Sequence, residues 1–98
     1  MQITSVKEND ALKVSISGRV DTTSAPELEK YVNENLGDLT NLIFDLADMK
    51  YTSSAGLRVF LKTQKKMNAI GSMKVINVND DVMEIFDMTG FSDILNIE

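Results

Sequence analysis

The residues best placed for chemistry are two adjacent serines, Ser53 and Ser54. They lie in the stretch YTSSAGL, between a segment that reads as a strand and one that reads as a helix. Either hydroxyl can cap the helix, because a serine side chain accepts from free N–H groups at a helix start. The same N–H groups and the helix dipole favour a phosphate, so a phosphorylatable serine is the second interpretation. The two interpretations are compatible, and both stay open.

Three carboxylates are expected near these serines. Asp45 and Asp48 lie at and beyond the end of the predicted central strand, and Asp21 precedes the first predicted helix. A phosphate carries about −1.5 to −2 charges, so it would make this loop strongly negative. Carboxylate oxygens also suit Mg²⁺. Turn residues and solvated carboxylates are the more ordinary interpretation of Asp45 and Asp48, and we predict no metal site.

The residue types that are missing exclude several classes of function. The chain has 98 residues with no His and no Cys, which excludes His-assisted nucleophilic catalysis, zinc and copper sites, and disulfides. No glycine-rich phosphate loop is present. The formal charge of −5 is unfavourable for binding nucleic acid or anionic membrane. With no apolar run near ~18 residues and no signal peptide, we expect a cytoplasmic binding module without a cofactor, not an enzyme.

The elements that must position the serines follow from the hydrophobic pattern. Strands and helices alternate in the order β-β-α-β-α-β-α-(β), which predicts a small α/β domain with a mixed, mostly parallel sheet and helices packed on it. The predicted strands are Gln2–Lys7, Leu12–Gly18, Leu42–Leu46, Met73–Val78 and a last one containing Ile94, Leu95 and Ile97. The predicted helices run from Ser24 to Gly37, from Ala55 to Ile70, and from the Asn79–Asp81 cap to Gly90.

Local signals add detail to these elements. Ser24 and Glu27 have the spacing of a capping box. The continuous apolar run from Leu42 predicts a strand buried on both faces. In the second helix, the predicted buried stripe contains Leu57, Phe60, Leu61 and Met67.

The surface pattern is less specific. Arg58, Lys62, Lys65 and Lys66 share one face of the second helix, either as a solvated face or as one that steers an acidic partner. The remaining apolar residues are expected to fill the core: Met49, Met67, Met73, Met83, Met88, Phe91 and Ile94.

Two motifs together resemble a known family. Thr52–Val59, TSSAGLRV, looks like the signature of bacterial anti-sigma factor antagonists, the stand-alone STAS domains. Gly18–Asp21 followed by Ala25–Leu28 resembles the other hallmark of that family. The resemblance covers essentially the whole chain, so residues 1–98 are expected to form a single STAS domain.

The resemblance implies a partner switch. In that family the dephosphorylated antagonist binds an anti-sigma factor that is also a serine kinase, which releases a sigma factor. The kinase then phosphorylates one serine of the antagonist, and a phosphatase resets it. Register on Gly56 and Leu57 puts Ser54 at the acceptor position, while Ser53 stands where many members have Asp and is the second choice. The expected partner-binding residues are Asp21, Thr22, Thr52, Ser53, Ala55, Gly56, Leu57 and Arg58.

Two alternatives remain. STAS-like domains also serve as subunits or regulators of transport systems, including lipid-handling ABC assemblies, without control by phosphorylation. A nucleotide-binding or hydrolysing domain is disfavoured by the missing glycine-rich loop.

Overall fold

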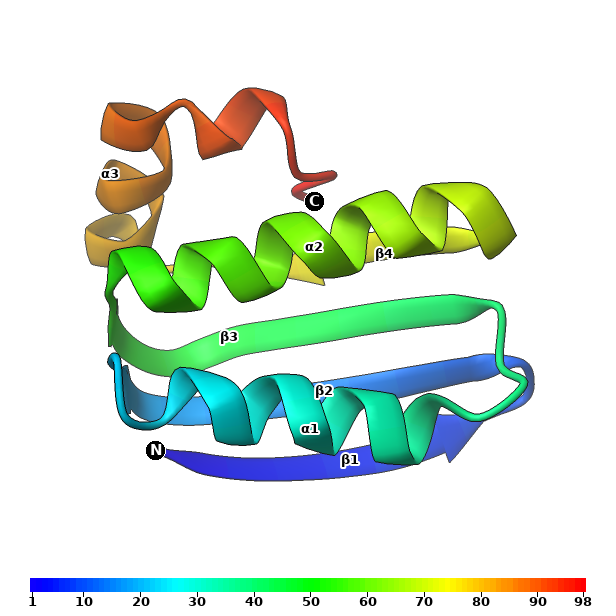
Figure 1. Cartoon of the computed structure of the whole chain (residues 1–98). Coiled ribbons are helices and arrows are strands. Elements are labelled where there is room, and N and C mark those ends of the chain that lie inside the picture. Colours follow the sequence, from blue (N-terminus) through cyan, green and yellow to red (C-terminus); the bar gives the residue numbers. More distant parts are fainter.

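Strands and helices follow one another in the predicted order (Figure 1). The computed structural model describes residues 1–98. A 3-10 turn, η1, follows the last helix. The elements are β1 Gln2–Glu8, β2 Ala11–Val20, α1 Ala25–Leu36, β3 Asn41–Thr52, α2 Ser54–Ile70, β4 Ser72–Ile76, α3 Asp80–Thr89 and η1 Phe91–Asp93.

The four strands lie in the sheet in chain order, β1-β2-β3-β4. β1 and β2 are antiparallel, because a tight turn at Asn9 and Asp10 joins them and Asn9 takes the left-handed φ of 56°. β2 and β3, and then β3 and β4, pair in parallel. A helix joins the strands of each parallel pair, as parallel pairing requires. The predicted mixed, mostly parallel sheet is confirmed.

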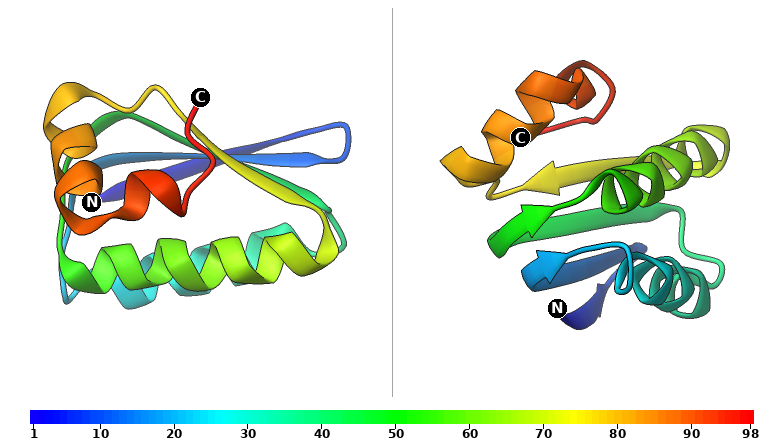
Figure 2. Two further views of the ribbon diagram at one scale, coloured as in Figure 1. Left: turned by 90° about the horizontal axis from the view of Figure 1, so that it is seen from above. Right: turned by 60° about the vertical axis from the view of Figure 1, so that its left-hand side comes forward.

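Both crossover helices, α1 and α2, cover the same face of the sheet (Figure 2). Leu42, Phe44 and Leu46 point into that layer and are buried, whereas Ile43 on the opposite face is only partly buried. The prediction that this strand is buried on both faces is therefore wrong. The apolar run looks continuous in the sequence because Ile43, on the outer face, is also apolar. In the sheet, Ile43 lies between its register partners Lys13 of β2 and Lys74 of β4.

Three phenylalanines join the layers of the core. Phe60 of α2 contacts Phe44 of β3 and Phe86 of α3, with ring centroids 5.1 and 6.3 Å apart and the rings nearly perpendicular. Such edge-to-face pairs stabilise beyond their buried area. Because all three rings are fully buried, α3 is fixed to the same core as α2.

The buried stripe of α2 differs at one position from the prediction. Leu57, Phe60 and Met67 are buried as predicted, but Leu61 is only half-buried. The stripe turns toward α1 instead and includes Val59, Thr63 and Gln64.

Methionines behave in two ways. Met49, Met67 and Met73 are buried as predicted, and Met83 is partly buried. Met88, however, is 76% exposed.

The two apolar residues predicted to pack after α3 differ from one another. Phe91 packs partly against the core, whereas Ile94 is 45% exposed. The prediction of packing is therefore wrong for Met88 and Ile94, because α3 turns its Val82 and Phe86 side inward and leaves Met88 on the outer side.

Two strands end at residues other than those predicted. β2 does not end at Gly18 but continues to Val20, because Gly18 takes a φ of 82° at an irregularity in the pairing with β3. β4 ends at Ile76, where Asn77 takes a left-handed φ of 58°.

The predicted last strand does not form. The C-terminal segment makes the η1 turn and then only a single parallel bridge, between Ile97 and Val75.

Candidate functional site

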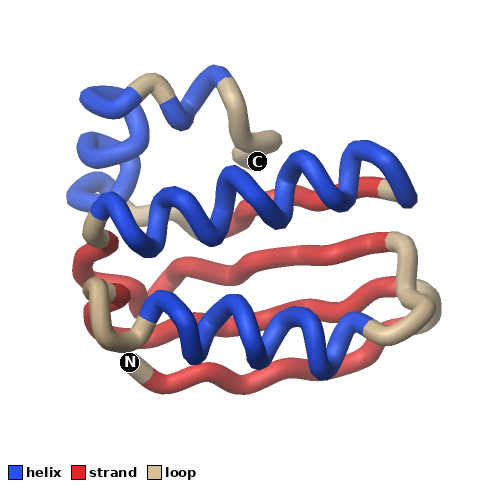
Figure 3. The backbone as a smooth tube through the Cα atoms, in the orientation of Figure 1, coloured by secondary structure: helices blue, strands red, loops and turns tan.

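The carboxyl ends of the parallel strands meet at one edge of the sheet, where loops gather (Figure 3). Val20 at the end of β2 pairs with Thr52 at the end of β3, and the Ser53 N–H donates to the Val20 carbonyl at 2.8 Å. Asp21 and Ser53, the residues that follow, are therefore brought together as predicted. Open parallel sheets bind ligands at this edge.

Ser53 is the N-cap of α2. Its backbone is extended, with φ −82° and ψ 175°, and its Oγ accepts from the Gly56 N–H at 3.4 Å. The Ser53 carbonyl accepts from the Leu57 N–H at 3.0 Å. The capping interpretation is confirmed for Ser53, which is half-buried.

Ser54 is the first residue of α2 and is exposed. The side-chain hydrogen bonds at this junction are made by Thr52, which donates to the Ser53 carbonyl, and by Ser53. The Ser54 hydroxyl takes part in neither. It is an accessible nucleophile in the first turn of a helix, where free N–H groups favour added negative charge.

Gly56 lets the first turn of α2 approach the strand ends. A Cβ at this position would overlap the Thr52 Oγ1 and would lie 2.8 Å from the Val20 Cγ1. No larger residue fits unless the helix shifts away from the sheet. Gly56 therefore sets the height of Ser54 above the edge.

Asp21 organises the other junction at this edge, between β2 and α1. Its Oδ1 accepts from the Ser24 N–H at 2.9 Å, from the Ser24 hydroxyl at 3.1 Å and from the Thr23 N–H at 3.0 Å. The bonds from the Ser24 backbone and side chain, followed by the bond from Thr23, hold the pKa of Asp21 below its usual value. The carboxylate is therefore charged over the whole neutral range.

The predicted capping box at α1 does not form. Ser24 occupies the N-cap position, but its side chain makes no cap bond to the helix. The Ser24 Oγ instead accepts from the Asp21 N–H at 2.9 Å and donates to the Asp21 carboxylate. The Asp21 N–H therefore takes the place of a helix N–H as the donor to this oxygen. The Ser24 backbone is also helical, with φ −88° and ψ −20°, rather than extended as at a usual N-cap.

A shallow groove lies between the first turns of α1 and α2. It has a volume of about 230 Å³ and is lined in part by Thr22, Glu29, Ala55, Arg58 and Lys62. Three predicted partner-binding residues, Thr22, Ala55 and Arg58, therefore share one surface next to Ser54.

Burial divides the predicted partner-binding set. Thr52 is 2% exposed, Leu57 is 6% exposed, and Gly56 is buried. The Thr52 and Leu57 side chains are covered in this structure, and Gly56 has no side chain to offer, so these three residues position the junction rather than face a partner. Asp21, Thr22, Ala55 and Arg58 remain accessible, together with the two serines.

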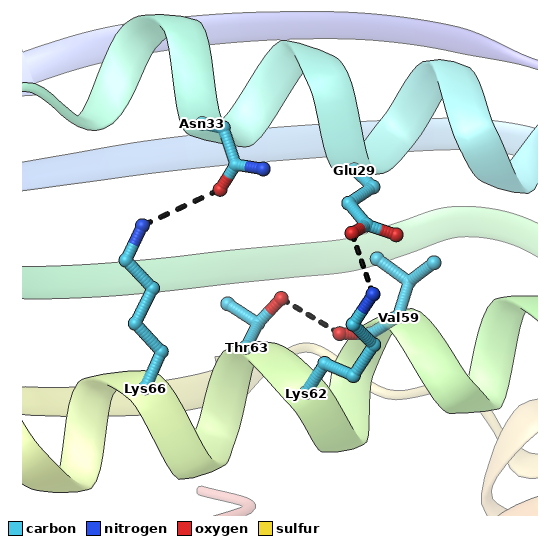
Figure 4. A network of polar contacts seen from close by, with 6 residues as sticks. All are labelled: Glu29, Asn33, Val59, Lys62, Thr63 and Lys66. Carbon is cyan, nitrogen blue, oxygen red and sulfur yellow. Dashed lines mark hydrogen bonds and ion pairs between the residues drawn. The ribbon is translucent and has the colours of Figure 1, made fainter.

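The basic face of α2 is partly used within the chain. Lys62 pairs with Glu29 of α1 at 2.8 Å, and the Lys66 Nζ donates to the Asn33 Oδ1 at 3.4 Å (Figure 4). These contacts join α1 to α2. Arg58 and Lys65 form no ion pair and face solvent.

Asp45 and Asp48 do not belong to this edge. Both lie inside β3, seven and four residues before its end. At ~3.3 Å per residue they are roughly 23 and 13 Å from Thr52 along the strand. Asp45 accepts from the Ala47 N–H and the Asn77 amide and pairs with Lys13. The expectation that these carboxylates surround the serines is therefore wrong.

Sequence reasoning missed two contacts near the site. The Arg19 guanidinium lies 4.4 Å from the centroid of the Tyr51 ring, because these two residues are partners in the β2–β3 register. The Asn79 amide donates to the Met49 carbonyl at 2.7 Å and ties the start of α3 to β3. The contact between Arg19 and Tyr51 could have been predicted only from the pairing register of β2 and β3, which the sequence does not show.

The chain belongs to the STAS domain family, whose model matches residues 2–98. The anti-sigma-B factor antagonist of Bacillus subtilis (strain 168) is 36% identical over 91 residues, covering 92% of this chain and 83% of that protein. The anti-sigma-B factor antagonist of Staphylococcus aureus (strain NCTC 8325 / PS 47) is 26% identical over 99 residues, covering 99% and 92%.

Solved structures share the fold. An anti-sigma factor antagonist from Mycobacterium paratuberculosis superposes with a TM-score of 0.87 at 22% identity, covering 98% of this chain and 83% of that one. The Bacillus cell fate determinant SpoIIAA in its phosphorylated form gives 0.76 at 13% identity, covering 99% and 91%. None of the helices described above has the length and apolar character needed to cross a membrane.

Proposed function

We propose that this protein is an anti-sigma factor antagonist, a regulatory binding module controlled by phosphorylation of Ser54. In its unphosphorylated form it binds an anti-sigma factor that is also a serine kinase, and a sigma factor is released. The kinase phosphorylates Ser54 and the complex separates, and a serine phosphatase restores the unmodified protein. Relatives that carry this name cover nearly the whole chain.

One observation supports Ser54 over Ser53 as the acceptor. The Ser53 Oγ caps α2, whereas the Ser54 hydroxyl is exposed and has no partner at the junction. Modification of Ser53 would remove a cap, which typically contributes about 1 kcal/mol. Modification of Ser54 leaves that cap in place.

The proposed switch works through surface charge. Asp21 lies at the junction next to the serines, whereas Asp45 and Asp48 lie far down β3. A phosphate on Ser54 adds about −1.5 to −2 charges to this edge next to the carboxylate of Asp21. A partner surface that buries a neutral hydroxyl would then have to bury an unpaired charge, which is strongly unfavourable.

The experiment that tests this proposal is phosphorylation by the cognate anti-sigma factor kinase. With ATP, intact-mass analysis should show one added phosphate on the wild type, mapped to Ser54, and none on Ser54→Ala. Ser53→Ala is the matched control and should still be modified. Phosphate added to Ser54→Ala at the wild-type rate would contradict the assignment.

The transport-subunit alternative makes the opposite prediction. It requires no modification of any serine and no effect of charge at position 54 on partner binding. Unmodified protein after exposure to an active kinase, together with capture by a transporter component, would favour it.

A further inference from the structure

Negative charge is concentrated in the C-terminal part of the chain. After Lys74 there are six Asp or Glu residues and no Lys or Arg. The chain as a whole carries −5, so the preceding residues are almost neutral. This charge gathers on α3 and the segment after it. α3 lies at the same side of the molecule as the start of α2 (Figure 1).

The carboxylates of α3 are arranged unfavourably for an isolated helix. Asp81, Glu84 and Asp87 are exposed and follow one another at spacings of three, so like charges lie on neighbouring turns of one face. None of them has an ion-pair partner. Asp87 lies near the C-terminal end of α3, where the helix dipole is negative and a carboxylate destabilises.

The same face carries an unusually exposed apolar side chain. Met88 is 76% exposed, the most exposed of the large apolar residues in the chain. It follows Asp87 directly and lies one helical turn after Glu84, so carboxylates flank it. An exposed, flexible methionine is typical of surfaces that adapt to a partner.

We propose that this face of α3, made of Asp81, Glu84, Asp87 and Met88, docks a basic segment of a partner protein that also presents an apolar side chain. A cationic segment would offset the repulsion along α3, and its apolar side chain would cover Met88. A single partner segment would therefore relieve both the repulsion between the carboxylates and the exposure of Met88. The proposal goes beyond the switch at Ser54, because it adds a second surface on a different element.

Charge selects this occupant over the others. Nucleic acid and anionic membrane are both negative, so the carboxylates would repel them. A second copy of the chain carries the same net charge of −5. Its basic face on α2 is also less available, because Lys62 and Lys66 already bind α1.

Site-specific cross-linking in the native host tests the proposal. Met88→p-benzoylphenylalanine should give, on irradiation, an adduct whose partner peptide contains Lys or Arg together with apolar residues. The matched control is Val6→p-benzoylphenylalanine, at a position that is 57% exposed on β1. Adding Glu84→Lys and Asp87→Lys should reduce the adduct by about tenfold, because like charges would then meet. Glu84→Gln with Asp87→Asn provides the milder version if the double reversal unfolds α3.

Four results would overturn the proposal. The first is no adduct above the Val6 control, and the second is an adduct with a neutral or acidic segment or with lipid. The third is an adduct of the chain with itself, which would assign the face to self-association. The fourth is loss of the adduct in a Ser54→Asp background, which would make this face part of the switch surface. We expect the Ser54→Asp background to leave the adduct yield unchanged.

Discussion

Two strand-to-helix junctions lie side by side at one edge of the sheet, and they use their hydroxyl groups differently. At the β2–α1 junction, Ser24 and Asp21 bind each other through three hydrogen bonds. At the β3–α2 junction, Ser53 caps the helix and Ser54 is left free. At the first junction the serine hydroxyl is fully used in hydrogen bonds within the junction. At the second junction the Ser54 hydroxyl makes no such bond and remains available for reaction.

The comparison shows that the proposed acceptor, Ser54, is separate from the contacts that hold α2 in place. Capping by Ser53 and close packing at Gly56 hold α2 in place without any contribution from Ser54. A group attached to Ser54 therefore changes the surface without removing a bond that holds the fold. The following predictions test this separation, from the largest expected effect to the smallest.

Charge at Ser54 should have the largest effect. Ser54→Asp should weaken binding to the cognate kinase by about 2–4 kcal/mol, roughly thirty- to almost thousandfold, because an interface would bury an unpaired charge. Ser54→Ala should bind like the wild type. Titration calorimetry measures both dissociation constants, and equal values for the two variants would contradict the switch.

Gly56→Ala should lower the free energy of unfolding by about 1–3 kcal/mol, because a Cβ there overlaps Thr52 and Val20. Chemical denaturation measures the change, with Ser54→Ala in the same turn as the control. Combining Gly56→Ala with Thr52→Ala should cost less than the sum of the single changes. Strict additivity would mean that the clash with the Thr52 hydroxyl does not limit the packing.

The hydrogen-bonded hydroxyl of Ser24 and the free hydroxyl of Ser54 should contribute differently to the stability of the protein. Ser24→Ala removes bonds to Asp21 and should cost about 1 kcal/mol, the usual net value of such hydrogen bonds. Ser54→Ala should change stability by less than about 0.5 kcal/mol, as exposed substitutions usually do. Urea denaturation measures both changes. Equal losses in the free energy of unfolding would contradict the difference between the two junctions.

Phosphorylation itself should change stability by less than about 1 kcal/mol. The helix N-terminus favours the phosphate by ~0.3–1 kcal/mol, and repulsion from Asp21 offsets part of this. Thermal melts of the modified and unmodified proteins should nearly coincide. Amide NMR shifts should change around Asp21 and from Thr52 to Val59, and shifts across α3 would indicate a conformational relay instead.

The smallest expected effect is on stability at acidic pH. Because hydrogen bonds from Ser24 and Thr23 lower the pKa of folded Asp21, its contribution to stability is present above about pH 4 and is lost as the pH falls through the lowered value. The stability difference between wild type and Asp21→Asn should therefore shrink below about pH 4. Asp38→Asn, an exposed site, is the control, and a difference that grows in acid would contradict the assignment.

Periodicity was sufficient to predict the order of elements and most of the core, because Leu12, Val14 and Ile16 alternate and the helices carry clear caps. Capping at Ser53 and contact between the edges of β2 and β3 were also predictable. The alternating burial of β3 was not, since a single Ile43 on an open face reads like a doubly covered strand.

What the sequence could not show depends on register and on competition between bonds. Arg19 meets Tyr51 only because β2 and β3 pair with a shift after Gly18. Ser24 fits a capping box, but its Oγ accepts from the Asp21 N–H in place of a helix N–H. Met88 resembles core filler until the orientation of α3 is known.

The chain-order arrangement of the sheet bears on how the protein is made. Each strand pairs with the one synthesised before it, β1 with β2, β2 with β3 and β3 with β4, and each crossover helix packs on the layer already started. Pairing takes place only between strands that follow one another in the chain, and the longest connections to be closed are the two helical crossovers, residues 21–40 and 53–71. The nascent chain can therefore extend one growing sheet as it leaves the ribosome, with the hairpin of β1 and β2 as its first template.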